Sequence, residues 1–143
     1  MKNNIDVATR IVSTLLVDTN VESFGVLHQS PYIQFRGKHG DIELYFDSGI
    51  TFYPQRDDKL SEAERMLLGM NSVNLKRVAD AFCTDTADLE VRFDDGSWFR
   101  INGTTEHEHE PWQLSDGTSV DEGGILLIAS SGDSNYAVWG SIA

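Results

Sequence analysis

Apolar residues recur with helical spacing near the start of the chain. This spacing predicts an amphipathic helix over residues 4–17, with an apolar face made of Ile5, Ala8, Val12, Leu15 and Leu16. A second helix is predicted at about residues 61–69, because Ser61 followed by Glu64 three positions later forms a capping-box pattern. We expect both helices to pack against a sheet.

Most of the remaining chain has the pattern of β-strands, in which apolar and polar positions alternate between turns that contain Gly, Asp or Ser. The predicted strands are residues 21–27, 32–36, 41–46, 50–53, 98–102, 112–114, 125–129 and 136–139. The segment 73–82 is ambiguous, because its apolar residues Leu75, Val78, Ala79 and Phe82 have helical spacing.

An internal repeat favours a strand in the ambiguous segment. Residues 35–52 match residues 82–99 at a constant offset of 47, and the centre of the match aligns DIELYFDSG with DLEVRFDDG. We interpret the match as the duplication of a hairpin unit. The alternative is that two unrelated hairpins share alternation and an Asp-x-Gly turn. If the duplication is right, residues 77–83 form a strand.

Together these patterns predict an α+β fold in a single domain, residues 1–143. We expect one twisted, mainly antiparallel sheet, because the predicted strands follow one another through short turns. This sheet would be built from the two related hairpin units and covered by the two helices. A chain of 143 residues suits one hydrophobic core.

Charge is distributed unevenly along the chain, whose net charge is −12. Residues 84–143 contain 12 acidic residues but only two basic ones, Arg92 and Arg100. Contacts with nucleic-acid phosphates or anionic lipids need Lys and Arg, so we expect neither nucleic acid nor a membrane as a partner. The distribution suits a cationic protein partner, although acidity also serves solubility alone.

The sequence shows no P-loop, dinucleotide-binding fingerprint or nucleophile elbow. The single cysteine, Cys83, is expected to be a small buried apolar residue, because no neighbouring residue suggests a lowered pKa. We therefore expect a binding protein rather than an enzyme, with no cofactor. One cysteine, together with an N-terminus that lacks the pattern of a signal peptide, favours the cytoplasm.

The segment EHEHE at residues 106–110 suggests a different chemistry. On a strand, the imidazoles of His107 and His109 would point the same way and could bind zinc, copper or nickel. A closed metal site needs more ligands, and the other histidines, His28 and His39, are distant in the sequence. Metal binding is therefore an alternative, and a solvated acidic loop is the favoured interpretation.

Aromatic residues are dense in the acidic half of the chain, and aromatic side chains beside acids can form the contact surface for a basic partner. Trp98 is expected to be exposed, because it follows the turn formed by Asp94, Asp95 and Gly96. The acids of that turn are typical turn residues rather than a catalytic pair. The predicted partner-binding residues are Asp94, Asp95, Trp98, Glu106, Glu108, Glu110 and Asp116.

The segment LEVRFDDGSWFRI, with the later segments EPWQL and YAVWG, resembles a small β-rich domain of bacterial proteins. The resemblance covers roughly residues 75–140, and related sequences look like immunity proteins of polymorphic toxin and contact-dependent growth inhibition systems. It implies a protein that binds a cognate toxin domain, often a nuclease, and blocks its active site. Toward a nuclease, the acidic residues would mimic phosphates. A metal-binding protein and a non-catalytic adaptor subunit are the alternatives.

Overall fold

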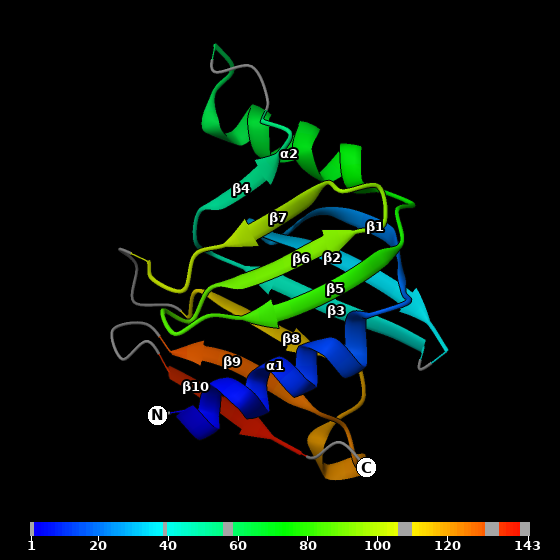
Figure 1. Cartoon of the computed structure of the whole chain (residues 1–143), viewed down its shortest axis with the longest axis vertical. Coiled ribbons are helices and arrows are strands. Elements are labelled where there is room, and N and C mark those ends of the chain that lie inside the picture. Colours follow the sequence, from blue (N-terminus) through cyan, green and yellow to red (C-terminus); the bar gives the residue numbers. More distant parts are fainter. Residues whose placement is uncertain (1, 39, 56–58, 106–109, 131–134, 141–143) are drawn as a thin grey trace.

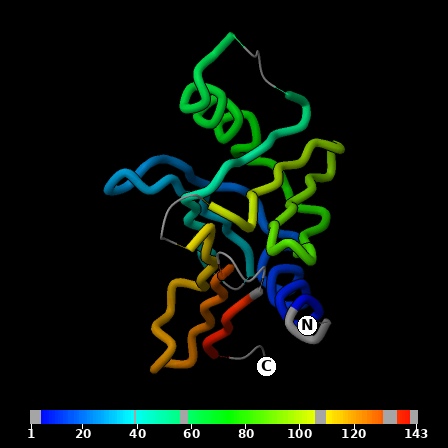
Figure 2. Tube along the Cα trace, turned by 90° about the vertical axis from the view of Figure 1, so that its left-hand side faces the viewer, coloured from blue at the N-terminus to red at the C-terminus, as the bar shows by residue number. Residues whose placement is uncertain are grey.

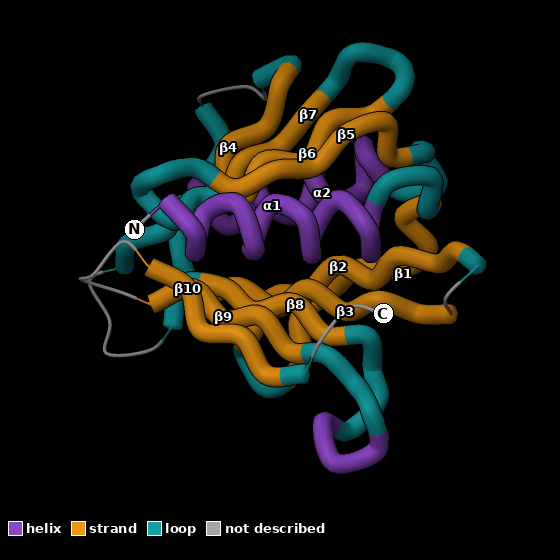
Figure 3. Tube along the Cα trace, turned by 60° about the horizontal axis from the view of Figure 1, so that its bottom comes forward, coloured by secondary structure: helices purple, strands orange, loops and turns teal. Residues whose placement is uncertain are grey.

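The computed structural model describes residues 2–38, 40–55, 59–105, 110–130 and 135–140. Its two α-helices are α1 (Lys2–Leu16) and α2 (Glu62–Val73). Both helices lie between two β-sheets, one of six strands and one of four (Figure 3). The outer face of each sheet therefore points away from the helices. Within the described residues, no helix is long and apolar enough to cross a membrane.

The larger sheet has the strand order β1-β2-β3-β8-β9-β10, and all its neighbouring strands are antiparallel. Its strands are β1 (Asn20–Leu27), β2 (Ser30–Gly37), β3 (Gly40–Phe46), β8 (Trp112–Ser115), β9 (Leu126–Ser130) and β10 (Asn135–Trp139). The tip of the β1–β2 hairpin projects from the body of the molecule (Figure 2). A short 3-10 helix, Val120–Glu122, interrupts the connection between β8 and β9.

The smaller sheet has the strand order β4-β7-β6-β5 and is also antiparallel. Its strands are β4 (Ile50–Tyr53), β5 (Val78–Cys83), β6 (Leu89–Phe93) and β7 (Trp98–Ile101). Figure 1 shows this sheet in front of β1, β2 and β3, with α1 running beside β5 and β10. The α+β class and the antiparallel pairing are thus confirmed.

The prediction of a single sheet is wrong, and the strands predicted at residues 41–46 and 50–53 do not pair with each other as a hairpin. β3 and β4 belong to different sheets. The chain leaves the larger sheet at Asp47, whose N–H donates to Pro111 O at 2.8 Å, and Ser48 Oγ donates to Asn102 O at 2.6 Å. These bonds hold Asp47 and Ser48 in a crossover, and β4 then pairs with β7.

The two halves of the sequence repeat also differ in register. Phe35 pairs with Ile42 and is fully buried, whereas Phe82 pairs with Glu90 and lies half-buried on the outer face of the smaller sheet. Strand pairing therefore does not reproduce the repeat, and its origin by duplication stays a prediction. The strand predicted for residues 77–83 is confirmed by β5.

The hydrophobic core fills the space between the two sheets. α1 contributes the buried residues Ala8, Ile11, Val12, Leu15 and Leu16, which confirms the predicted apolar face except for Ile5, which is only partly buried. α2 begins at the predicted capping box of Ser61 and Glu64 but extends beyond its predicted end, to Val73. The extension follows from packing, because Gly69, Met70 and Val73 are buried.

Candidate functional site

The outer face of the smaller sheet carries an unusual row of side chains, here named the arginine–aromatic face. Strand alternation turns the neighbours Phe52, Val91 and Phe99 into the core, where all are buried. The residues between them point outward. The face consists of Tyr53 on β4, Trp98 and Arg100 on β7, Glu90 and Arg92 on β6, and Phe82 on β5.

Glu90 lies at the centre of the face and holds both arginines. Its side chain is fully buried, and its Oε1 accepts from Arg100 Nε at 2.9 Å and from Arg100 Nη2 at 2.5 Å. Its Oε2 accepts from Arg92 Nε at 2.5 Å. Burial alone would raise the pKa of Glu90, but the hydrogen bonds from Arg100 and Arg92 outweigh it and lower the pKa below the ordinary value.

The aromatic rings extend this centre toward both edges of the sheet. Tyr53 stacks on Trp98 with ring centroids 5.6 Å apart and planes 12° apart. The Arg100 guanidinium lies 5.9 Å from the Trp98 ring centroid, and the Arg92 guanidinium lies 5.8 Å from that of Phe82. A cation is attracted to the face of an aromatic ring. Each arginine is therefore fixed by a ring as well as by Glu90. The row is therefore ordered before any partner binds.

Three of the predicted partner-binding residues lie on this face or at its rim. Trp98 is in the row, although it is half-buried rather than fully exposed. Asp94 and Asp95 form the exposed tip of the β6–β7 hairpin. Asp95 contacts Lys76 Nζ at 2.8 Å and accepts from the Ser97 main chain and hydroxyl. Bonds from Lys76 and Ser97 lower the pKa of Asp95 and stabilise the hairpin tip, where the Asp95 side chain is still 48% exposed.

Two further predicted contacts, Glu110 and Asp116, are not brought to this face. Glu110 and Asp116 flank β8 in the larger sheet, and Asp116 Oδ1 accepts from the N–H groups of Thr118 and Ile125, which makes it a loop-stabilising residue. The remaining predicted residues, Glu106, Glu108, His107 and His109, lie outside the described residues. Within the described ranges, no group of three or more His, Cys, Asp or Glu side chains could hold a metal ion. The metal alternative stays a prediction.

Sequence reasoning missed Tyr53, Glu90, Arg92 and Arg100. A signal was present in the two strand sequences, LEVRF and WFRI. Glu90 and Arg92 are two positions apart, so both point to the same side of β6, and Arg100 pairs with Glu90 across the sheet. The only two basic residues after Lys76 and Arg77 therefore converge on one carboxylate.

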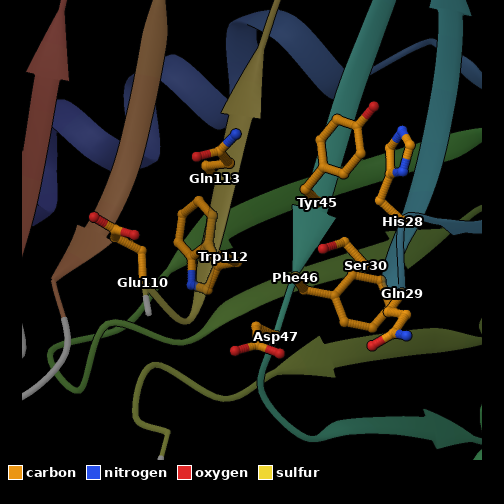
Figure 4. Close-up of a pocket in the computed structure, with 9 residues that line it drawn as sticks. All are labelled: His28, Gln29, Ser30, Tyr45, Phe46, Asp47, Glu110, Trp112 and Gln113. Carbon is orange, nitrogen blue, oxygen red and sulfur yellow. The ribbon is translucent and has the colours of Figure 1, made fainter. Parts of the chain in front are cut away.

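A separate cavity of about 390 Å³ lies at the end of β3 and β8, beside the β1–β2 turn (Figure 4). Asp47 lines it, and its Oδ2 atom is buried with no hydrogen-bond partner among the described residues. The turn residues His28 and Gln29 both adopt left-handed backbone conformations, with φ of 51° and 69°. The cavity brings acidic, amide and imidazole groups together on the larger sheet, away from the arginine–aromatic face.

Cys83 is buried, as predicted, and burial raises the pKa of its thiol to about 12, which a hydrogen bond with Tyr136 only partly offsets. Only the thiolate reacts with disulfide reagents. We expect the folded protein to react with such a reagent at pH 8 at least about tenfold more slowly than the urea-unfolded protein does. A colorimetric thiol assay measures both rates, and equal rates would contradict the burial.

No family model, no curated protein and no solved structure matches this chain. The resemblance to toxin immunity proteins therefore depends on the sequence segments alone. The functional argument has to come from the chemistry of the described surfaces.

Proposed function

We propose that the protein is an immunity protein that binds a cognate bacterial toxin domain and blocks its active site. The observation that carries the proposal is the arginine–aromatic face, in which Tyr53, Trp98, Arg92 and Arg100 are held on an open sheet surface by the buried Glu90. The resemblance of residues 75–140 to immunity proteins supports it, since this range contains every member of the face except Tyr53.

The composition of the face suits a protein partner. Trp, Tyr and Arg are the residue types that most often dominate binding energy in protein interfaces. Each guanidinium has five N–H donors, and Glu90 accepts one from Arg92 and two from Arg100. The remaining donors can bind carbonyl or carboxylate groups of the toxin. Because Glu90 already fixes the side chains, binding would cost little further side-chain entropy.

Charge outside the face favours a basic partner. The chain has a net charge of −12, and Asp94 stands exposed at the hairpin tip beside the face. Such a field speeds the approach of a cationic domain, and its effect decreases as salt rises. In this arrangement the rings and arginines supply the central contacts, while Asp94 pairs with a Lys or Arg at the rim.

The first experiment identifies the toxin and measures protection. The tagged protein is isolated from its native cytoplasm, the retained protein is sequenced, and the corresponding toxin domain is expressed with and without this chain. We expect growth only when both are present, with one-to-one binding by calorimetry that weakens as salt rises. A stable partner whose expression is harmless would contradict the immunity role and favour an adaptor subunit.

Substitution of Trp98 tests the position of the interface. We expect Trp98→Ala to weaken toxin binding by about tenfold or more, because it removes the central ring of the face. Trp139→Ala is the matched control, since Trp139 is an exposed tryptophan on β10 of the other sheet. Calorimetry with both variants provides the comparison. Equal losses of affinity in both variants, or a loss with Trp139→Ala alone, would exclude the arginine–aromatic face as the toxin-binding surface.

Substitution of one rim acid completes the test. Asp94→Lys should slow association without affecting the hairpin, because it is Asp95 that binds Lys76 and Ser97. Asp121→Lys makes the same charge change on the exposed 3-10 helix of the β8–β9 connection. If both variants slow association equally, only the net charge matters and Asp94 is not at the rim.

A further inference from the structure

β4 is an edge strand whose outer side has open main-chain groups. Asn102 N–H donates to Gly49 O at 2.9 Å, which fixes the phase of the β4–β7 ladder. Main-chain groups in an antiparallel ladder alternate in direction. The N–H and C=O groups of Thr51 and Tyr53 therefore point toward β7, whereas those of Ile50 and Phe52 point to the open side of β4. Within the described residues, no hydrogen-bond partner is present for these four groups.

The opposite edge of the same sheet is closed. The Thr9 hydroxyl of α1 accepts from Cys83 N–H at 3.0 Å and donates to Cys83 O at 3.4 Å. Asp80 Oδ1 accepts from Ala81 N–H at 2.9 Å, and Val78 bonds through both its main-chain groups to residues 18 and 19. Edge strands that are not protected attract further strands. The protein therefore protects β5 and leaves β4 available.

A cleft of about 750 Å³ runs beside the open edge, between β4 and the N-terminal half of α2. Ile50, Phe52, Ala63 and Met66 give it an apolar floor. At one end it meets a second hollow, which shares Ser48, Gly49 and Glu62 with it and is also lined by Asp47. The cleft therefore has an apolar floor, Arg65 and Gln55 lie among its polar lining residues, and Glu62 and Asp47 make the end that meets the second hollow acidic.

We propose that this cleft binds an extended segment of a partner protein, which adds to β4 as a fifth strand. The main chain of the segment would bond to the open groups of Ile50 and Phe52, and alternate side chains would enter the apolar floor. The acidic end, with Asp47 and Glu62, selects a segment that carries Lys or Arg there. The proposal is independent of the immunity role, because it uses the edge of β4 rather than the outer face.

The size and the contacts of the cleft favour an extended chain over a helix or a small molecule. β4 is four residues long, so a segment of similar length satisfies its edge. A helix would leave the main-chain groups of Ile50 and Phe52 without partners, because its own N–H and C=O groups bond internally. A strand provides both a donor and an acceptor at every second residue.

The test uses the full chain and a phage-displayed library of random peptides of about ten residues. We expect selected peptides to alternate apolar and polar positions and to carry a basic residue near one end. Their binding should slow hydrogen exchange at the amides of Ile50 and Phe52 at least about tenfold, as NMR would show. Selection of no peptide, or protection confined to other strands, would overturn the proposal.

Two variants of α2 test the position of the peptide. Ala63→Trp fills the cleft from an exposed helix position, and we expect it to weaken peptide binding by about tenfold or more. Leu68→Trp adds a ring at an exposed position of the same helix that does not line the cleft, so binding should be unchanged. Methylation of alternate peptide nitrogens should also abolish binding, and retention of affinity would exclude strand addition.

Discussion

Glu90→Gln is expected to lower the free energy of unfolding by about 2 kcal/mol, because hydrogen bonds to a charged group contribute more than neutral ones. The amide keeps the shape of the side chain but has one acceptor oxygen, whereas the carboxylate uses both oxygens to hold Arg92 and Arg100. The loss stays below that of a deeply buried ion pair, because the side chains of Arg92 and Arg100 are 51% and 44% exposed and can be hydrated. Urea denaturation at pH 7 measures the difference.

The pH dependence of this difference has a definite sign. The folded state lowers the pKa of Glu90 below its ordinary value of 4.5, so the folded protein binds a proton less readily than the unfolded chain. The stabilisation is therefore fully present above about pH 4.5 and is lost as the pH falls through the folded pKa. The gap between wild type and Glu90→Gln should be constant at neutral pH and narrow in acid. A gap that widens in acid would contradict the assignment.

Glu43 provides the control, since it occupies the corresponding position in the sequence repeat, on the outer face of the larger sheet. It is opposite Gln34 and Ser115 and forms no salt bridge within the described residues. Glu43→Gln should change the free energy of unfolding by no more than about 0.5 kcal/mol. If both substitutions lower the free energy of unfolding by the same amount, the bonds to Arg92 and Arg100 do not make Glu90 more stabilising than Glu43.

Local sequence patterns predicted the strands well but could not assign them to sheets. The turn at Asp47, Ser48 and Gly49 has the composition of a hairpin turn, as does the true hairpin turn at Asp94, Asp95 and Gly96. What separates them is the bonding of Ser48 to Asn102 and Pro111, which are 54 and 63 residues away. Such distant partners leave no trace in the local alternation, so the single sheet was a natural but wrong prediction.

The same limit applies to the candidate site. Counting charges showed an acidic half with two arginines, but a count does not reveal which acids already have partners. Asp95 and Asp116 stabilise loops through bonds with Lys76 and with main-chain groups. Strand alternation predicts only which side of β6 carries Glu90, and in the structure this residue is the buried centre of the arginine–aromatic face. Cross-strand pairing, rather than composition, determined these roles.

Gly103→Ala is expected to destabilise the protein by about 3 kcal/mol, because no space exists for a methyl group. A Cβ at this position would lie 2.1 Å from Thr86 O and 2.4 Å from Ala87 O, both main-chain atoms. This loop cannot easily move away. Ala87 O accepts from Nε1 of the buried Trp112 at 2.8 Å, and Gly103 N–H itself donates to Asp88 Oδ1 at 2.7 Å.

Gly96→Ala separates steric crowding from backbone strain. Gly96 has φ of +90°, and a Cβ there would meet nothing within 4 Å, so alanine costs only the strain of a left-handed conformation, about 1–2 kcal/mol. Position 103 requires glycine because a Cβ has no space there, whereas position 96 requires glycine because of its left-handed backbone conformation. Urea denaturation of both variants should therefore rank Gly103→Ala as the more destabilising. The reverse order would mean that the loop of residues 84–88 can move to make room for the methyl group. The hydrogen bond from Trp112 to Ala87 O would then not fix this loop against the core.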